Sequence, residues 1–213
     1  MLLQNLLSCS LRAAAVLDVL EACSGLALAV FLWLHMIFVA TILLGRSTFD
    51  GIAHGLDAYY LSYTGIPPLI AIFFLHFLLA ARKIPATYRE QRVMWNHASR
   101  LRHKDSWTWL VQVVSGMAIL LLASIHFWVV LTTWPIEASL SIHRVGQWPY
   151  LVFYLLLLFL GELHAGFGLY RLAVKWGWPP RRRAGIFFEI ISLCVIGLGL
   201  TALVIFRRLG GGP

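Results

Sequence analysis

Charged residues are scarce in this chain of 213 residues, since Asp, Glu, Lys and Arg together make up only 12% of it. In an ordinary soluble domain about a quarter of the residues are charged. The chain is instead 60% hydrophobic. This composition excludes an ordinary soluble domain and indicates a protein that buries much of its length in lipid.

Cysteine is scarce as well. Cys9, Cys23 and Cys194 lie far apart and form no Cys-x-x-Cys pair, which excludes a cysteine-ligated zinc site or iron–sulfur cluster in this chain. We expect Cys23 and Cys194 to pack as small hydrophobic residues. The apolar start of the chain lacks a clear cleavage site, so no removed signal peptide is predicted.

Five segments are apolar enough to cross a bilayer core, which takes roughly 20 residues of helix. They are residues 24–45, 66–83, 107–133, 148–176 and 185–206. Pro67 and Pro68 would lie in the first turn of the second span, where a missing N–H costs least. We therefore predict an all-α polytopic membrane protein, in which residues 1–213 form one membrane domain with five transmembrane helices.

The basic residues lie between the apolar runs, an arrangement that sets membrane orientation, so we expect no nucleic-acid partner despite a formal charge of +8. With the N-terminus in the cytoplasm, the cytoplasmic side holds Arg12, Arg82, Lys83, Arg89, Arg92, Arg100, Arg102, Lys104, Arg171, Lys175, Arg181, Arg182 and Arg183. The other side holds only Arg46, Arg144, Arg207 and Arg208. The positive-inside rule thus predicts a cytoplasmic N-terminus and an outer C-terminus.

Histidines occur one in each of the first four spans, as His35, His76, His126 and His164. An ionisable group there costs a few kcal/mol unless something stabilises it. Counted at about 1.5 Å per residue from the cytoplasmic charges, His76 and His164 lie roughly 10 Å deep, and His35 and His126 about 20–30 Å deep. Paired imidazoles at two levels predict two b-type haems, each held by histidines from different helices.

Two other interpretations of these histidines stay open. The four could make unrelated polar contacts between helices, whereas zinc is disfavoured because its sites usually gather three or four ligands at one level. If haem is bound, its propionates need cations near the inner level. The candidates are Arg82, Lys83, Arg171 and Lys175, with Trp109 as a further donor, and the same residues would also serve as simple interfacial anchors.

Four stretches of the sequence resemble one known family. They are WLHMIFVATILLG (33–45), HFLLAARKIPATYR (76–89), SIHFW (124–128) and GELHAGFGLYRLAVKWGW (161–178). They resemble the dihaem cytochrome b membrane subunit of bacterial quinol:fumarate reductases and succinate:menaquinone oxidoreductases, over residues 24 to 178. The resemblance implies two haems b, with His35, His76, His126 and His164 as axial ligands and with the first span paired to the third and the second to the fourth.

The resemblance also implies a place in the bacterial cytoplasmic (inner) membrane, with a periplasmic C-terminus. Menaquinol would be oxidised near the outer haem in anaerobic respiration. Electrons would pass to an iron–sulfur subunit and a FAD-containing flavoprotein subunit on the cytoplasmic side, which reduces fumarate, and the heterotrimers would dimerise. The chain itself has no residues for a flavin or a cluster, and its basic 82–106 loop, with Trp95 and Trp107, is the predicted dock for the iron–sulfur subunit.

Glu162 stands two residues before His164, so their side chains would diverge by about 200° on a helix. The glutamate is therefore expected to face away from the haem that its neighbour holds. Two roles stay open on this ground, a polar path for protons or a protonated glutamate bonded to a neighbouring helix. The resemblance implies the first role, with compensating protons carried inward.

The loop RSTFDGIAHGLDAYYLSYTGIPP, between the first two spans, holds the candidates for quinol oxidation, which needs a proton acceptor. His54 and Asp57 would share a face if this loop were helical. The resemblance implies a glutamate at the position of Asp57, whose side chain is shorter. The other interpretation is an amphipathic helix in the interface, with Tyr59, Tyr60 and Tyr63 as anchors.

Two other functions stay open from the sequence. One is a dihaem subunit that serves a hydrogenase or a formate dehydrogenase, against which the stretch at 161–178 argues. The other is a haem-free transporter in which intramembrane His and Glu residues relay protons. An absorption spectrum separates the transporter from a cytochrome.

Overall fold

The computed structural model describes residues 11–101, 104–178 and 180–211, and no strand occurs among them. The five helices that are long and apolar enough to cross a membrane are α2 (Leu11–Ala40, continued by the 3-10 turn η1, Thr41–Leu44), α4 (Leu61–Ala81), α6 (Lys104–Leu131), α8 (Trp148–Lys175) and α9 (Arg181–Leu209). The predicted class, an all-α polytopic membrane protein with five transmembrane helices, is confirmed.

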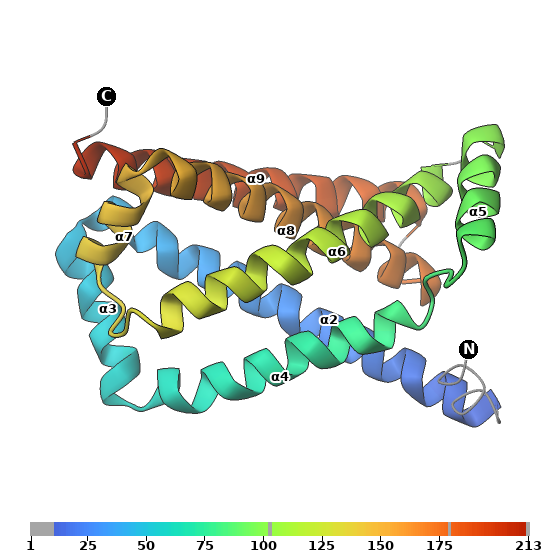
Figure 1. Ribbon diagram of the computed structural model, residues 1–213, viewed down its shortest axis with the longest axis horizontal. Helices are drawn as coiled ribbons and strands as arrows, with labels where there is room; N and C mark the ends of the chain where they lie inside the picture. The colour runs from blue at the N-terminus through green and yellow to red at the C-terminus, as the bar shows by residue number, and fades with distance from the viewer. Residues whose placement is uncertain (1–10, 102–103, 179, 212–213) are drawn as a thin grey trace.

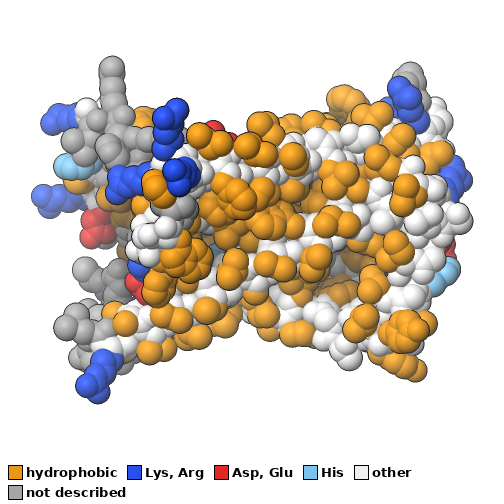
Figure 2. Space-filling model, turned by 180° about the vertical axis from the view of Figure 1, so that it is seen from behind, with side chains coloured by type: hydrophobic (Ala, Val, Ile, Leu, Met, Phe, Trp, Pro, Cys, Tyr) orange, Lys and Arg blue, Asp and Glu red, His pale blue; other side chains and the backbone are white. Residues whose placement is uncertain are grey.

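The five long helices run along the longest axis of the molecule (Figure 1). At one end lie α5 (Tyr88–Leu101) and the start of α2, and we call this the basic end. Two short helices, α3 (Arg46–Ala58) and α7 (Ala138–Gly146), lie at the opposite end together with the C-terminus. Figure 2 shows Lys and Arg gathered mainly at the basic end, with hydrophobic side chains covering the long middle of the surface.

The middle of the bundle exposes large apolar side chains on its outer surface. Leu34, Leu78, Leu121 and Leu193 are between 62% and 70% exposed. Lipid tails are as apolar as these side chains, so a membrane helix has no reason to turn them inward. A buried core forms instead near the opposite end, where side chains from η1, α3, α7 and α9 pack together.

The helices of the first and second spans begin well before the predicted spans. The second span begins at Leu61 rather than residue 66, so Pro67 and Pro68 lie inside α4 and not in its first turn. A proline in a helix removes the bond from its own nitrogen to the carbonyl of the fourth residue before it. Here those carbonyls belong to Tyr63 and Thr64, in the first turn of α4.

The first span also starts earlier than predicted, because α2 extends back to Leu11. The charged residues Asp18 and Glu21 end the apolar run in the sequence, yet the helix continues through them, and both carboxylates pair with cations that directly follow α4. Cys23 and Cys194 lie on exposed surfaces of α2 and α9 rather than packing inside, which corrects the expectation for them.

Candidate functional site

A cavity of about 1240 Å³ runs between α2, α4, α6 and α8. Its lining extends from Asp18 and Lys83 at the basic end to Glu137 at the opposite end, and it includes His35, His76, His126 and His164. The volume exceeds the roughly 300–1,000 Å³ that is usual for one bound small molecule. The cavity therefore has room for more than one ligand.

The four histidines meet in two pairs inside this cavity. The rings of His35 on α2 and His126 on α6 lie with their centroids 6.0 Å apart and their planes at 65°. The rings of His76 on α4 and His164 on α8 lie with their centroids 6.5 Å apart and their planes at 86°. These are the two levels that the residue spacing predicts and the helix pairs that the resemblance implies.

Both distances suit a metal ion held between two imidazoles. An imidazole nitrogen binds a first-row metal at about 2.0–2.1 Å and lies about 1.1 Å from its ring centroid, which together put two opposed centroids about 6.2 Å apart. The described residues contain no group of three or more His, Cys, Asp or Glu that could hold a metal ion by itself. Two imidazoles with an open cavity around them are instead the donor set of a haem iron with two axial histidines.

The Nδ1 atoms of one pair have hydrogen-bond partners. His76 Nδ1 lies 3.1 Å from Ser24 Oγ, and His164 Nδ1 lies 2.9 Å from the carbonyl oxygen of Gln112. In the other pair, His126 Nδ1 is buried and has no hydrogen-bond partner within the described part of the chain. No role for Ser24 or Gln112 was predicted from the sequence.

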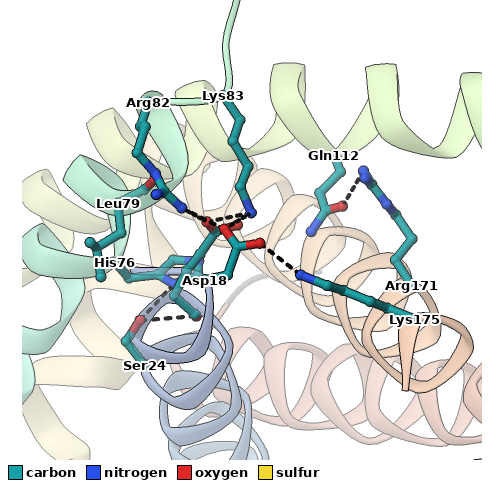
Figure 3. Close-up of polar contacts among 10 residues, drawn as sticks. Asp18, Ser24, His76, Leu79, Arg82, Lys83, Gln112, Arg171 and Lys175 are labelled. Carbon is teal, nitrogen blue, oxygen red and sulfur yellow. Dashed lines mark hydrogen bonds and ion pairs between the residues drawn. The ribbon is translucent and has the colours of Figure 1, made fainter. Parts of the chain in front are cut away.

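Carboxylates and cations form a cluster at the basic end of the cavity (Figure 3). Asp18 bonds Arg82 at 2.7 Å, Lys83 at 3.1 Å and Lys175 at 2.9 Å. Glu21 bonds Lys83 at 2.7 Å. These ion pairs were not predicted from the sequence, because the partners of Asp18 and Glu21 lie far away along the chain.

The residues proposed to meet haem propionates are mostly at this end. Lys83, Trp109, Arg171 and Lys175 line the cavity, whereas Arg82 is not among the described lining residues. Arg171 donates a hydrogen bond to Gln112 Oε1 at 3.0 Å. Arg82, Lys83 and Lys175 pair with the carboxylates of Asp18 and Glu21, whereas Arg171 bonds an amide.

Arg144 is a basic residue that lines the cavity at the opposite end, and its role there was not predicted from the sequence. Its side chain lines the cavity, donates a hydrogen bond to Thr133 Oγ1 and interacts with His126 and Tyr154. A signal for it exists in the sequence, because Arg144 is one of few basic residues on its side of the predicted membrane. It gives the second histidine pair a cation of its own.

Glu162 lies outside the cavity lining, on another side of α8 from His164, as the spacing predicts. Its side chain is buried, with 1% of the residue exposed, and its Oε1 accepts a hydrogen bond from Ser192 Oγ of α9 at 2.9 Å. Glu162 Oε2 makes no hydrogen bond of normal geometry among the described residues, and the indole of Trp33 on α2 lies beside it. Ser192 therefore holds one carboxyl oxygen, and the other faces the indole N–H.

His54 and Asp57 both lie on α3, so the loop that contains them is helical, as their shared face requires. His54 is exposed and Asp57 is half-buried. The cavity reaches α3 through Phe49, Ile52 and Leu56, and neither candidate belongs to the lining that the structure describes. Both stand beside the cavity at its opposite end rather than inside it.

Comparison with known proteins gives a consistent result. The model of a family described as the succinate dehydrogenase/fumarate reductase transmembrane subunit matches residues 88–199. The fumarate reductase cytochrome b subunit of Wolinella succinogenes is 34% identical over 218 aligned positions, which cover 93% of this chain and 84% of that protein. The protein with the same name from Helicobacter pylori strain 26695 is 33% identical over 202 positions, which cover 86% and 79%.

Proposed function

Because the chain belongs to the family of succinate dehydrogenase/fumarate reductase transmembrane subunits, we propose that it is the membrane-anchoring, quinol-oxidising cytochrome b subunit of a fumarate reductase complex. Its relatives carry that cytochrome name. The observation that supports the proposal most is the arrangement of four histidines as two imidazole pairs along one cavity.

The ligands follow from these pairs. His35 and His126 would hold one haem b, and His76 and His164 the other. Haem b supplies reversible one-electron transfer when it is bound. Lys83, Arg171 and Lys175 would bind the propionates at the basic end, assisted by Arg82 through Asp18 and by Trp109. Arg144 is the corresponding cation at the opposite end.

Quinol oxidation is assigned to the opposite end, near α3. A menaquinol that gives up two electrons also releases two protons, and these need an acceptor at the site of oxidation. We assign this role to Asp57, which is half-buried at the end of α3, with His54 on the same face as a second acceptor. The position of Asp57 matches that of an acid in the family that the sequence resembles.

Glu162 is assigned to proton movement between the two ends. Its Oε2 would take and release a proton while Ser192 holds Oε1 in place. Inward movement of a proton would compensate the charge of an electron that moves toward the basic end. The carboxyl group lies between α8 and α9, apart from the imidazole pairs, so proton and electron follow separate routes through the bundle.

The basic end is assigned to the cytoplasmic side of a bacterial inner membrane, where an iron–sulfur subunit would dock and pass electrons to a FAD-containing flavoprotein subunit. The 82–106 loop supports this assignment. Its helix α5 stands off from the membrane bundle (Figure 1), and Trp95 packs against Trp107 with ring centroids 5.9 Å apart. The complete heterotrimer would form a dimer.

A reduced-minus-oxidised absorption spectrum of the purified complex tests the proposal. We expect bands of b-type haem, two haems per copy of this chain, and reduction of both by a menaquinol analogue. A protein without haem would overturn the proposal and favour a proton-coupled transporter. Haem that is reduced by hydrogen or formate through soluble partners, with no fumarate reduction, would identify a different electron donor complex.

A further inference from the structure

A fifteen-residue pattern occurs twice in the membrane bundle. Residues 21–35 read EACSGLALAVFLWLH in α2, and residues 112–126 read QVVSGMAILLLASIH in α6. Both begin with an acidic or amide residue, contain a Ser-Gly pair and end in a histidine of the His35–His126 pair. The Ser-Gly pairs lie near the other two histidines, His76 and His164, which belong to the neighbouring helices α4 and α8.

The glycines let an imidazole approach the helix backbone closely. A Cβ atom built at Gly25 would lie 2.8 Å from Cε1 of His76, and a Cβ at Gly116 would lie 2.8 Å from Cε1 of His164. Real Cβ contacts are not this short, so any other residue would push the ring away. Each ring thus rests on the face of the neighbouring helix at a glycine.

The serines determine which ring nitrogen carries the proton. Ser24 donates its hydroxyl hydrogen to the carbonyl of Glu21 at 3.0 Å, and Ser115 donates to the carbonyl of Gln112 at 3.1 Å. A hydroxyl has a single hydrogen, so each Oγ can only accept from a histidine. Their partners are His76 Nδ1 at 3.1 Å (Figure 3) and His164 Nδ1 at 3.3 Å.

The backbone carbonyl of Gln112, 2.9 Å from His164 Nδ1, can only accept as well. Both Nδ1 atoms must therefore be protonated, and the lone pair of each ring lies on Nε2. This is the tautomer in which Nε2 binds a metal ion while Nδ1–H donates to a protein acceptor. The same three elements, a glycine, a serine and the carbonyl three residues before it, occur at both rings.

We propose that Ser24–Gly25 and Ser115–Gly116 are a duplicated histidine seat, which fixes the tautomer and the ring plane of His76 and His164 so that both present Nε2 to one haem iron. The inference rests on the proposed function, because it assigns positioning residues to a proposed ligand pair. The seat keeps the two ring planes at 86°. His126 has no such seat, since its Nδ1 lacks a partner within the described residues.

The test uses Ser24→Ala and Ser115→Ala in the complete complex. Loss of the serine acceptor should weaken haem binding at this pair by about ten- to a hundredfold in Ser24→Ala, measured as haem transfer to apomyoglobin. The effect should be smaller in Ser115→Ala, because His164 Nδ1 keeps the carbonyl of Gln112 as an acceptor. Loss of the serine acceptor should also raise the midpoint potential of this haem, because a less basic imidazole stabilises ferric iron less. The low-spin ferric EPR signal, which depends on the angle between the axial ring planes, should shift for this haem alone.

The two haem signals are assigned with His35→Ala, which leaves the seated pair. Thr201→Val is the matched control, because this hydroxyl on α9 bonds the carbonyl of Gly197 in its own helix. Ser24→Thr retains an acceptor and should restore the original potential. Gly25→Ala and Gly116→Ala should displace the rings, with Gly197→Ala as the control, since nothing lies within 4 Å of a Cβ there.

The outcomes separate the two proposals. Two bound haems with unchanged affinity, potential and EPR signal in both Ser→Ala variants would overturn the seat and leave the proposed function intact. Equal changes in Thr201→Val would also overturn it, because the effect would then be general. A wild-type complex without haem would overturn the proposed function itself.

Discussion

The two histidine pairs share one cavity but are held in different ways. Both rings of the His76–His164 pair have polar partners for Nδ1 and lie near the carboxylate and cation cluster of the basic end. The other pair lies among aromatic rings. His35 stacks on Phe31 at 5.7 Å, and His126 meets the edge of Tyr154 at 5.8 Å.

This difference shows that one arrangement of paired imidazoles can be stabilised by two kinds of neighbour. Hydrogen bonds fix a tautomer and a ring direction, whereas aromatic packing fixes the ring position and leaves Nδ1 open. Substitutions near one pair should therefore leave the other pair unchanged.

Removal of one histidine should eliminate the haem of its own pair and leave the other haem bound. We expect His76→Ala or His164→Ala to eliminate the haem at the basic end, and His35→Ala or His126→Ala to eliminate the other, because one imidazole cannot replace two axial ligands. Haem content per chain, measured as the pyridine haemochrome, should fall from two to one in each variant. The control is His97→Ala on the exposed face of α5, and two haems in any of the four variants would contradict the ligand assignment.

Removal of the proposed proton acceptor should affect only the opposite end. Asp57→Asn should slow quinol oxidation by roughly 10²- to 10⁴-fold, the usual contribution of a positioned general base. Electron exchange between the haems and the soluble subunits should stay normal, as measured by stopped-flow absorption. Asp57→Glu is the matched variant and should retain turnover, whereas normal turnover in Asp57→Asn would remove this residue from the site.

Glu162→Gln should slow quinol-driven fumarate reduction by about tenfold or more, because the amide keeps the bond with Ser192 but cannot release a proton. Both haems should remain, since this side chain lies outside the cavity lining. Turnover is measured in vesicles together with haem content. Glu90→Gln, an exposed carboxylate on α5, is the control, and full turnover in Glu162→Gln would leave this residue a structural role only.

Neutralised cations should give the smallest effects, each at its own end. Lys175→Gln should lower the midpoint potential of the His76–His164 haem, and Arg144→Gln that of the His35–His126 haem, because a nearby positive charge favours the reduced state. Exposed charge pairs are worth ~0.2–1 kcal/mol, which corresponds to roughly 10–40 mV for one electron. Redox titration measures this, with Arg92→Gln on α5 as the control. Equal shifts of both haems would show that the two ends are not electrostatically separate.

Much of the fold and of the candidate site could be predicted from the sequence. Long apolar runs identify membrane helices because lipid satisfies no backbone group, which leaves the helix as the local solution. The four histidines could also be identified from the sequence. An ionisable side chain inside a membrane span costs free energy, so its presence there indicates a functional role. The boundaries at Leu11 and Leu61 were missed because charged residues and prolines stop an apolar run without stopping a helix.

The histidine seat was missed although a signal was present. The Ser-Gly pair recurs at the same distance before His35 and before His126, and an internal comparison of α2 with α6 would have found it. The comparison would not have shown what the Ser-Gly pairs contact, because each pair contacts a histidine of another helix. Ser24 lies far along the chain from His76, as Asp18 does from Lys175, and no local rule connects them.

The five membrane helices, with one histidine in each of four of them, follow from the order of residues alone, because helix formation and burial in lipid depend on residues close together along the chain. The three-dimensional packing was needed to show which ring nitrogen is bonded, that Asp18 shares the cations of the basic end, and that Arg144 reaches the second pair. Those outcomes depend on how the helices rotate and approach one another, and packing between distant segments sets that rotation.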